Sequence, residues 1–95
     1  MTDLATPAVQ SSARKLTQLQ ERAVRIRAAE IGNKLRSGQI VSDVELDDAL
    51  AKSAAEVNLA SSYVEAALTD YTRSFGAVAR HKVPEAMRKR LGIHI

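Results

Sequence analysis

The stretch AAEVNLASSYVEAAL, residues 54–68, predicts two helices that meet at a corner. Ala54 and Val57 continue the apolar spacing of the residues before Asn58, whereas Val64 and Leu68 belong to a stripe of different phase after it. Asparagine adopts the left-handed backbone region more readily than most residues, so a reversal of the chain is expected at Asn58. The second helix of the pair is predicted to begin around residue 60 or 61.

The helix before this corner has a clear predicted start. Ser42 is followed three residues later by Glu45, which is the spacing of a capping box, and the helix is therefore predicted to begin at Asp43. Acidic residues fill its first turns, as suits the positive end of a helix dipole. The residues expected on its buried side are Leu46, Leu50, Ala54 and Val57.

An earlier amphipathic helix is predicted from Ser11 or Ser12 to Arg36, and Ser37 with Gly38 should end it. Apolar residues recur there at three- and four-residue steps in two sets: Leu16, Leu19, Ala23 and Ile26, and Val24, Ala28, Ile31 and Leu35. Residues 1–10 show no such periodicity and are interpreted as a mobile N-terminal arm.

After the corner, an apolar stripe runs from Val64 through Tyr71 and Phe75 to Val78 and Ala79. The pattern leaves open whether the helix breaks at Gly76. Proline favours the first turn of a helix and pushes the preceding residue out of helical geometry, so a last short helix is predicted over residues 84–91, with Gly92 as its cap. The fold class expected is all-α, a small bundle of about four helices in a single domain, residues 11–95.

The composition limits the core of this domain. Of its 95 residues, 45% are hydrophobic, but the aromatic ones are Tyr63, Tyr71 and Phe75 alone and alanine is abundant. Large side chains contribute most of the burial energy. A homodimer or another protein partner is therefore expected to supplement the core.

The sequence shows no machinery for catalysis, and a non-enzymatic role without a cofactor is expected. Cysteine is absent, and His81 and His94 have no neighbouring cluster of ligands that would predict a metal site. No nucleophile elbow or glycine-rich phosphate loop is present. Without a signal peptide pattern or a long apolar run, the chain is expected in the cytoplasm, with no membrane partner.

The corner resembles the helix-turn-helix motif of bacterial and phage DNA-binding regulators over SAAEVNLASSYVEAALTDY, residues 53–71. Ala54 matches the small residue packed between the helices, Val57 and Leu59 match the apolar residues around the turn, and Asn58 stands where these motifs usually have glycine. Val64 with Ala67 or Leu68 matches the buried side of the second helix. The resemblance implies a DNA-binding regulator whose second helix enters the major groove. The residues that would face the bases are Ser61, Ser62, Glu65, Ala66 and Thr69.

Charge is distributed in three blocks. Residues 14–36 carry seven basic and two acidic side chains, residues 43–70 carry one basic and seven acidic, and residues 73–90 carry six basic and one acidic. Because an acidic motif is repelled by DNA, phosphate binding would fall to the flanking cations. The candidates are Arg14, Lys15, Arg22, Arg25, Arg27, Arg73, Arg80, Lys82, Arg88, Lys89 and Arg90.

A second interpretation fits the same pattern. An alanine-rich helical hairpin gives this apolar spacing without any nucleic acid, and the acidic block can be neutralised by the basic ones within a bundle or across a dimer interface. The chain would then be a helical adaptor or inhibitor of the phage or plasmid accessory type, acting through protein-protein binding.

Overall fold

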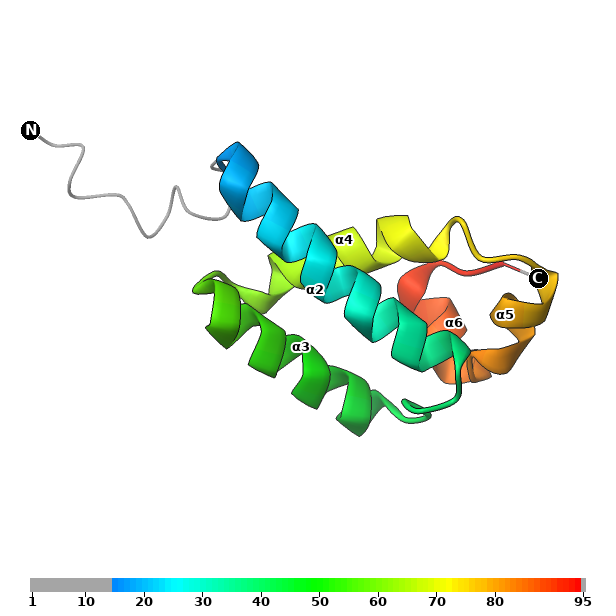
Figure 1. The fold of residues 1–95 in the computed structure, drawn as a ribbon. Coiled ribbons are helices and arrows are strands. Elements are labelled where there is room, and N and C mark those ends of the chain that lie inside the picture. The colour runs from blue at the N-terminus through cyan, green and yellow to red at the C-terminus, as the bar shows by residue number, and fades with distance from the viewer. Residues whose placement is uncertain (1–14, 95) are drawn as a thin grey trace, which may run out of the picture.

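The computed structural model describes residues 15–94 and consists of helices and connecting turns, with no strand in that part of the chain. The helices, labelled as in Figure 1, are α2 (Gln18–Arg36), α3 (Asp43–Val57), α4 (Ser61–Thr72), α5 (Ala77–Lys82) and α6 (Glu85–Leu91). The all-α prediction is confirmed, with five helices in place of about four. The arm predicted for residues 1–10 lies outside the described residues.

Helix α2 begins later than the sequence prediction placed it. Residues 15–17 are not helical, so a start at Ser11 or Ser12, which themselves lie outside the described residues, is wrong. The reason is a capping box that the sequence pattern did not single out. The Thr17 hydroxyl accepts a hydrogen bond from the Gln20 amide, and the Gln20 side chain accepts one from the Thr17 amide.

Helix α3 starts where predicted. The Ser42 hydroxyl accepts the amide of Glu45 at 3.2 Å, and the Glu45 carboxylate accepts the amide of Val41 at 2.8 Å. The glutamate thus bonds one residue further back than in a standard capping box, and the amides of Val41 and Glu45 are both satisfied by side chains.

The corner at Asn58 is confirmed. Asn58 has φ 58° and ψ 45°, and it is the only residue other than glycine with positive φ in residues 15–94. The Asn58 amide donates to the carbonyl of Ala55 at 3.2 Å, and the Leu59 amide donates to that of Ala54 at 3.1 Å. These two bonds form a Schellman cap, which ends α3 and lets α4 begin at Ser61.

The left-handed backbone at Asn58 leads to a first prediction. Asn58→Ala should lower the free energy of unfolding by about 1 kcal/mol, because alanine pays ~1–2 kcal/mol to enter this region and lacks the short polar side chain with which asparagine offsets part of that cost. Asn58→Gly should leave stability within about 0.5 kcal/mol of the parent protein, since glycine adopts positive φ without strain. Urea denaturation of the three proteins measures both changes. Equal losses for the two variants would contradict this account of the corner.

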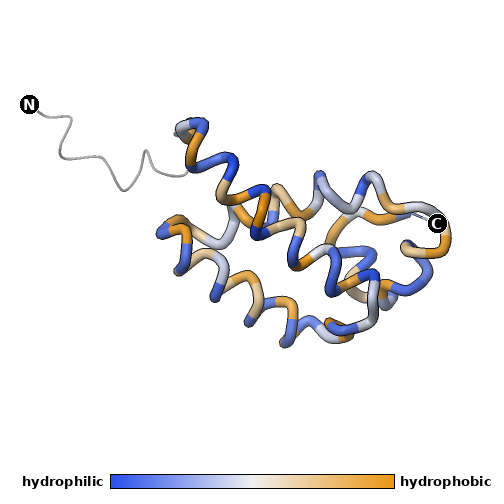
Figure 2. The backbone as a smooth tube through the Cα atoms, in the orientation of Figure 1, coloured by the Kyte–Doolittle hydropathy of each residue, from blue (hydrophilic) through white to orange (hydrophobic). Residues whose placement is uncertain are grey.

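The core lies where α2, α3 and α4 pack against one another, with α6 closing one end (Figures 1 and 2). Of the two apolar sets on the first helix, the one that contains Ala28, Ile31 and Leu35 faces this core. Leu46, Leu50, Val64 and Leu68 meet it from α3 and α4, and Val83, Met87 and Leu91 fill it from the C-terminal part.

The stripe predicted to continue through Val78 is interrupted. Helix α4 ends at Thr72, Gly76 caps the separate helix α5, and Val78 is 72% exposed, so its predicted place in the stripe is wrong. The break has a physical reason: the turn carries Phe75 into the core, where it is 3% exposed. The Arg80 guanidinium donates a hydrogen bond to the Phe75 carbonyl, with Nε 2.9 Å from the oxygen.

The C-terminal helix follows the prediction closely. Val83 is extended and buried, Pro84 caps the helix, and α6 starts one residue later. Gly92 has φ 71°, and the Ile93 amide donates to the Arg88 carbonyl in a second Schellman cap. This cap turns Ile93 back onto the core.

Candidate nucleic-acid interface

Helix α4 has one side in the core and one side open. Val64, Leu68 and Thr72 are buried against the other helices, and α2, α3 and α4 each contact both of the others. Two helices joined by a short turn and braced by a third form the framework in which helix-turn-helix proteins present a recognition helix. The side of α4 opposite the core is therefore the candidate surface.

Three of the predicted base-facing residues are exposed and two are partly covered. Ser61, Ser62 and Ala66 are exposed, whereas Glu65 and Thr69 are half-buried. The Thr69 hydroxyl donates to the Glu65 carbonyl at 3.1 Å, which leaves its oxygen available only as an acceptor. We call Ser61, Ser62, Ala66 and Thr69 the α4 outer face.

Glu65 turns toward α6, where Arg90 binds three carboxylates. Arg90 Nε lies 3.0 Å from Glu65 Oε2, and its two terminal nitrogens lie 3.3 Å from Asp43 Oδ1 and 2.6 Å from Asp47 Oδ1. The side chain of Arg90 is 26% exposed. Hydrogen bonds to Glu65 and then Asp47 raise the pKa of Arg90 above its ordinary value, so it stays charged. Glu65 and Arg90 were both predicted to contact DNA, and they are bonded to each other instead.

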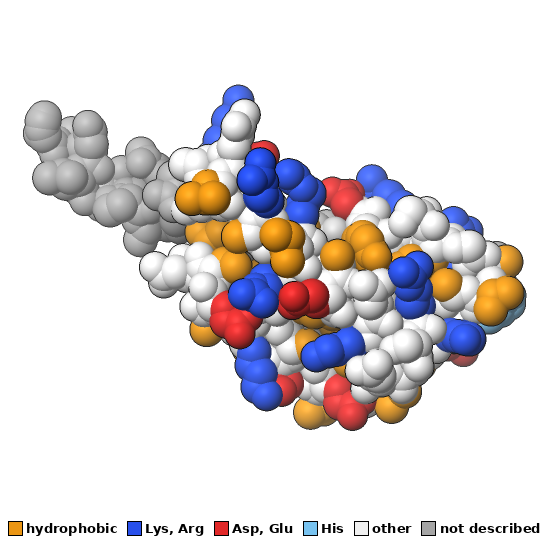
Figure 3. Space-filling model, viewed as in Figure 1, with side chains coloured by type: hydrophobic (Ala, Val, Ile, Leu, Met, Phe, Trp, Pro, Cys, Tyr) orange, Lys and Arg blue, Asp and Glu red, His pale blue; other side chains and the backbone are white. Residues whose placement is uncertain are grey.

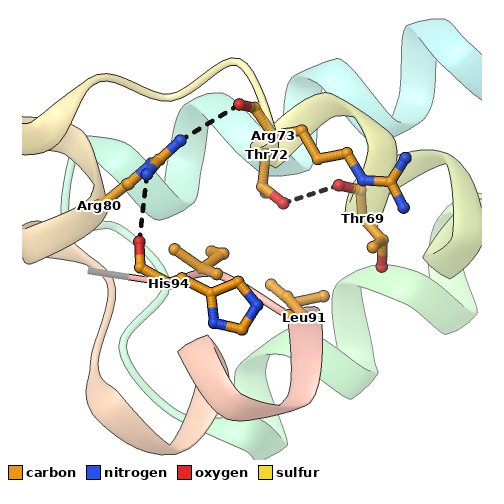
Figure 4. A pocket seen from close by; sticks show the side chains of 8 residues that line it. Thr69, Thr72, Arg73, Arg80, Leu91 and His94 are labelled. Atoms are coloured by element: carbon orange, nitrogen blue, oxygen red, sulfur yellow. Dashed lines mark hydrogen bonds between the residues drawn. The ribbon is translucent and has the colours of Figure 1, made fainter.

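Arg80 is a second predicted phosphate ligand whose donors are engaged. Its guanidinium donates to the carbonyls of Phe75, His94 and Arg73, and so fastens the C-terminal segment to the turn after α4. Figure 4 shows Arg80 on one side of a pocket of about 390 Å³ whose floor includes Leu91. Arg73 points away from Arg80 and pairs with Asp70 at 3.2 Å. The pocket therefore lacks a free cationic group aimed into it.

The other cations predicted to bind phosphate fall into two groups, those with a carboxylate nearby and those without one. Arg27 lies 3.3 Å from both Glu30 and Glu56, while Arg25 and Lys89 have carboxylates at 3.9 Å one helical turn away. Cations in residues 15–94 without a carboxylate within 4.0 Å include Lys15, Arg22, Lys82 and Arg88. Arg14 lies outside the described residues.

Two cations that the sequence interpretation passed over belong with the unpaired set. Lys34 and Arg36 stand in the last turn of α2, and neither has a carboxylate within 4.0 Å in the described part of the chain. Arg36 instead places its guanidinium 5.7 Å from the centre of the Phe75 ring. Their position at a helix C-terminus was the available signal, because the dipole there favours positive charge.

The acidic block is largely neutralised in space. Among residues 15–94, every acidic side chain except Glu45 lies within 4.0 Å of a basic one, and Arg27 and Arg90 reach it from α2 and α6. Figure 3 shows Asp and Glu side chains scattered among the more numerous Lys and Arg side chains of one face. Within residues 15–94, the cations left without a carboxylate partner are Lys15, Arg22, Lys34, Arg36, Lys82 and Arg88, together with Arg80, which is bonded to backbone carbonyls.

Other site types have little support within the described residues. No group of three or more His, Asp or Glu side chains there is arranged to hold a metal ion. None of the helices in that range combines the length and the apolarity required of a membrane span. A shallow groove of about 600 Å³ runs between the N-terminal half of α2 and the length of α4, lined in part by Val24, Arg25 and Ala66.

No family model, no curated protein and no solved structure matches the chain, so its function must be inferred from its own residues.

Proposed function

We propose that the chain is a small DNA-binding regulator that presents the α4 outer face to the major groove. The observation that carries the proposal is the three-residue corner at Asn58, which leaves this face exposed on a helix braced by α2 and α3. Serine and threonine hydroxyls bond several base edges, and Ala66 suits contact with a thymine methyl group.

The charge distribution supports the same proposal. Glu65 and Asp70, the two acids of α4, are paired with Arg90 and Arg73. Arg25 lines the same groove as Ala66, and Arg73 follows Ala66 by seven residues along the chain. Phosphate binding is assigned to Arg25 and Arg73 beside the face, and to the unpaired cations Lys15, Arg22, Lys82 and Arg88.

A matched pair of charge insertions tests this proposal. Ala66→Glu places a carboxylate at the centre of the proposed interface, and Ala51→Glu makes the same change on the exposed side of α3. We expect Ala66→Glu to weaken binding to a labelled duplex at least tenfold, because it repels phosphate at contact distance, and Ala51→Glu to weaken it less than about threefold. Fluorescence anisotropy measures both affinities.

Salt dependence supplies the control for this experiment. The affinity of the parent protein should fall at least about tenfold between roughly 50 and 200 mM salt, and Arg88→Ala should reduce the slope by about one phosphate contact. Absence of binding at low salt, or equal losses for Ala66→Glu and Ala51→Glu, would reject the assignment.

The homodimer expected from the composition is part of the proposal, since two copies would double the phosphate contacts on adjacent half-sites. Light scattering of the free protein measures its mass directly, and a monomer at all concentrations would remove this part.

A second candidate function is protein binding as a helical adaptor or inhibitor. It is favoured by apolar side chains left outside the core, among them Leu19 at 76% and Ile26 at 52% exposure on α2.

A further inference from the structure

Helix α2 carries two apolar stripes, and only one of them is covered. Val24, Ala28, Ile31 and Leu35 are buried, whereas Leu19 and Ile26 are exposed and Ala23 between them is half-buried. We call Leu19, Ala23 and Ile26 the α2 outer stripe. Their spacing of four and three residues places them on one side of the helix, as in a coiled-coil seam.

The surroundings of this stripe are mainly basic, and the acid that follows it, Glu30, one turn after Ile26, is paired with Arg27 at 3.3 Å. Lys15 and Arg22 have no carboxylate within 4.0 Å in the described residues. The carboxylate near Arg25 is that of Glu21, 3.9 Å away, and both side chains are well exposed. Figure 3 shows hydrophobic side chains along α2 at the front of the molecule, with Lys and Arg side chains beside them. An apolar strip edged by unpaired cations is complementary to an apolar strip edged by carboxylates.

A second copy of the chain fits this surface poorly. Antiparallel pairing of two α2 helices along the stripe sets Arg22 beside Arg22 of the other copy, and parallel pairing sets Arg22 beside Arg27, which already has Glu30 and Glu56 as partners and so offers Arg22 no carboxylate of its own. Like charges at such flanking positions oppose association. The stripe also spans only about two turns, which is short of the ~800 Å² per partner that a stable dimer interface buries.

From these observations we propose that the α2 outer stripe binds an amphipathic helix of another protein whose apolar side is flanked by glutamate or aspartate. Leu19 and Ile26 supply the apolar anchors, and Arg22, together with Lys15 just before the helix, pairs with the acidic flanks of the partner. The proposal builds on the second candidate function, protein binding, and does not depend on DNA binding.

Two synthetic peptides of equal length test the proposal directly. Both carry leucine at one helical stripe, and the residues that flank it are glutamate in one peptide and lysine in the other. The acidic peptide should bind at least about tenfold more tightly, because it pairs with cations that repel the basic peptide. Amide chemical shift changes in the protein should concentrate in residues 15–26. Equal affinity for the two peptides, or shifts elsewhere, would overturn the proposal.

Variants of the protein separate the apolar contribution from the charge contribution. Leu19→Gln and Ile26→Gln keep the helix, and each should weaken binding of the acidic peptide by about tenfold. Val78→Gln, at an exposed apolar residue on α5, should leave the affinity for this peptide unchanged. Arg22→Glu should reduce the preference for the acidic peptide over the basic one. Equal effects of Val78→Gln and Leu19→Gln would contradict a specific stripe.

Two further readouts distinguish the alternatives. Duplex DNA affinity should be unchanged by Leu19→Gln, so failure of peptide binding and failure of DNA binding are seen independently. Amide chemical shifts of the α2 outer stripe that change as the free protein is concentrated would show self-association there. They would overturn the assignment to an acidic partner helix.

Discussion

Gly32→Ala is expected to lower the free energy of unfolding by up to about 2 kcal/mol, although alanine is normally the better residue inside a helix. Gly32 lies in α2 opposite the ring of Tyr71 on α4. A β-carbon at residue 32 would overlap the Cδ2 and Cε2 atoms of that ring. The glycine therefore forms the notch that lets α2 and α4 approach each other.

The Tyr71 ring cannot move aside without loss. Its hydroxyl donates to Asn33 Oδ1 at 3.0 Å, and its ring meets Phe75 edge-to-face with centroids 5.9 Å apart. Displacing the ring would break both contacts and disturb Phe75, which is buried. Such overpacking costs typically ~1–3 kcal/mol, which exceeds the ~1 kcal/mol that alanine gains over glycine in a helix.

A double-mutant cycle tests this explanation through a change of sign. In a Tyr71→Ala background the overlap is gone, so Gly32→Ala should become neutral or stabilising by up to about 1 kcal/mol. Urea denaturation of the parent, the two single variants and the double variant gives the coupling energy. If Gly32→Ala destabilises both backgrounds equally, the notch is not its cause.

Gly32 also illustrates what the sequence does not reveal. A glycine inside an amphipathic pattern predicts only a small loss of helix stability, and nothing near residue 32 indicates that Tyr71 will cross it. The corner at Asn58, the cap at Ser42 and the stop at Gly92 were predicted correctly because each depends on hydrogen bonds within a few residues. Local chemistry of this kind is visible in the order of residues.

The features that the sequence missed depend on contacts between distant segments. The pattern offered two apolar stripes on α2 and gave no criterion for which one faces the core, and it extended the stripe of α4 to Val78. For the candidate interface, the helix-turn-helix resemblance placed Ser61, Ser62 and Ala66 on the open side of the second helix, and these three residues are exposed. It did not indicate that Glu65 would be paired, because Arg90 is 25 residues further along the chain.

Arg90→Met should lower the free energy of unfolding by about 1–3 kcal/mol. This lies between the ~0.2–1 kcal/mol that an exposed ion pair contributes and the ~3–5 kcal/mol lost when one partner of a buried ion pair is removed. The variant leaves Asp43, Asp47 and Glu65 close together without a cation. Lys89→Met is the matched control, because Lys89 is the preceding residue of α6 and its side chain, 79% exposed, has a carboxylate only at 3.9 Å. It should cost less than about 0.5 kcal/mol.

The contribution of Arg90 should not vary with pH through its own titration. Because carboxylate hydrogen bonds raise its pKa above the ordinary value, the stabilisation is complete below that ordinary value and is lost only in strong alkali. The difference in stability between the parent protein and Arg90→Met should therefore be the same at about pH 6 and about pH 9. Thermal denaturation at the two pH values measures it.

Two further substitutions separate the bridging role of Arg90 from simple charge. Arg90→Lys keeps the charge, but a single ammonium group cannot direct separate donors at three carboxylates, so an intermediate loss is expected. Adding Glu65→Gln to Arg90→Met should recover part of the stability, because it removes one of the mutually repelling groups. If Arg90→Met costs no more than Lys89→Met, the three pairs contribute nothing beyond surface charge, and Arg90 again becomes a candidate for binding phosphate.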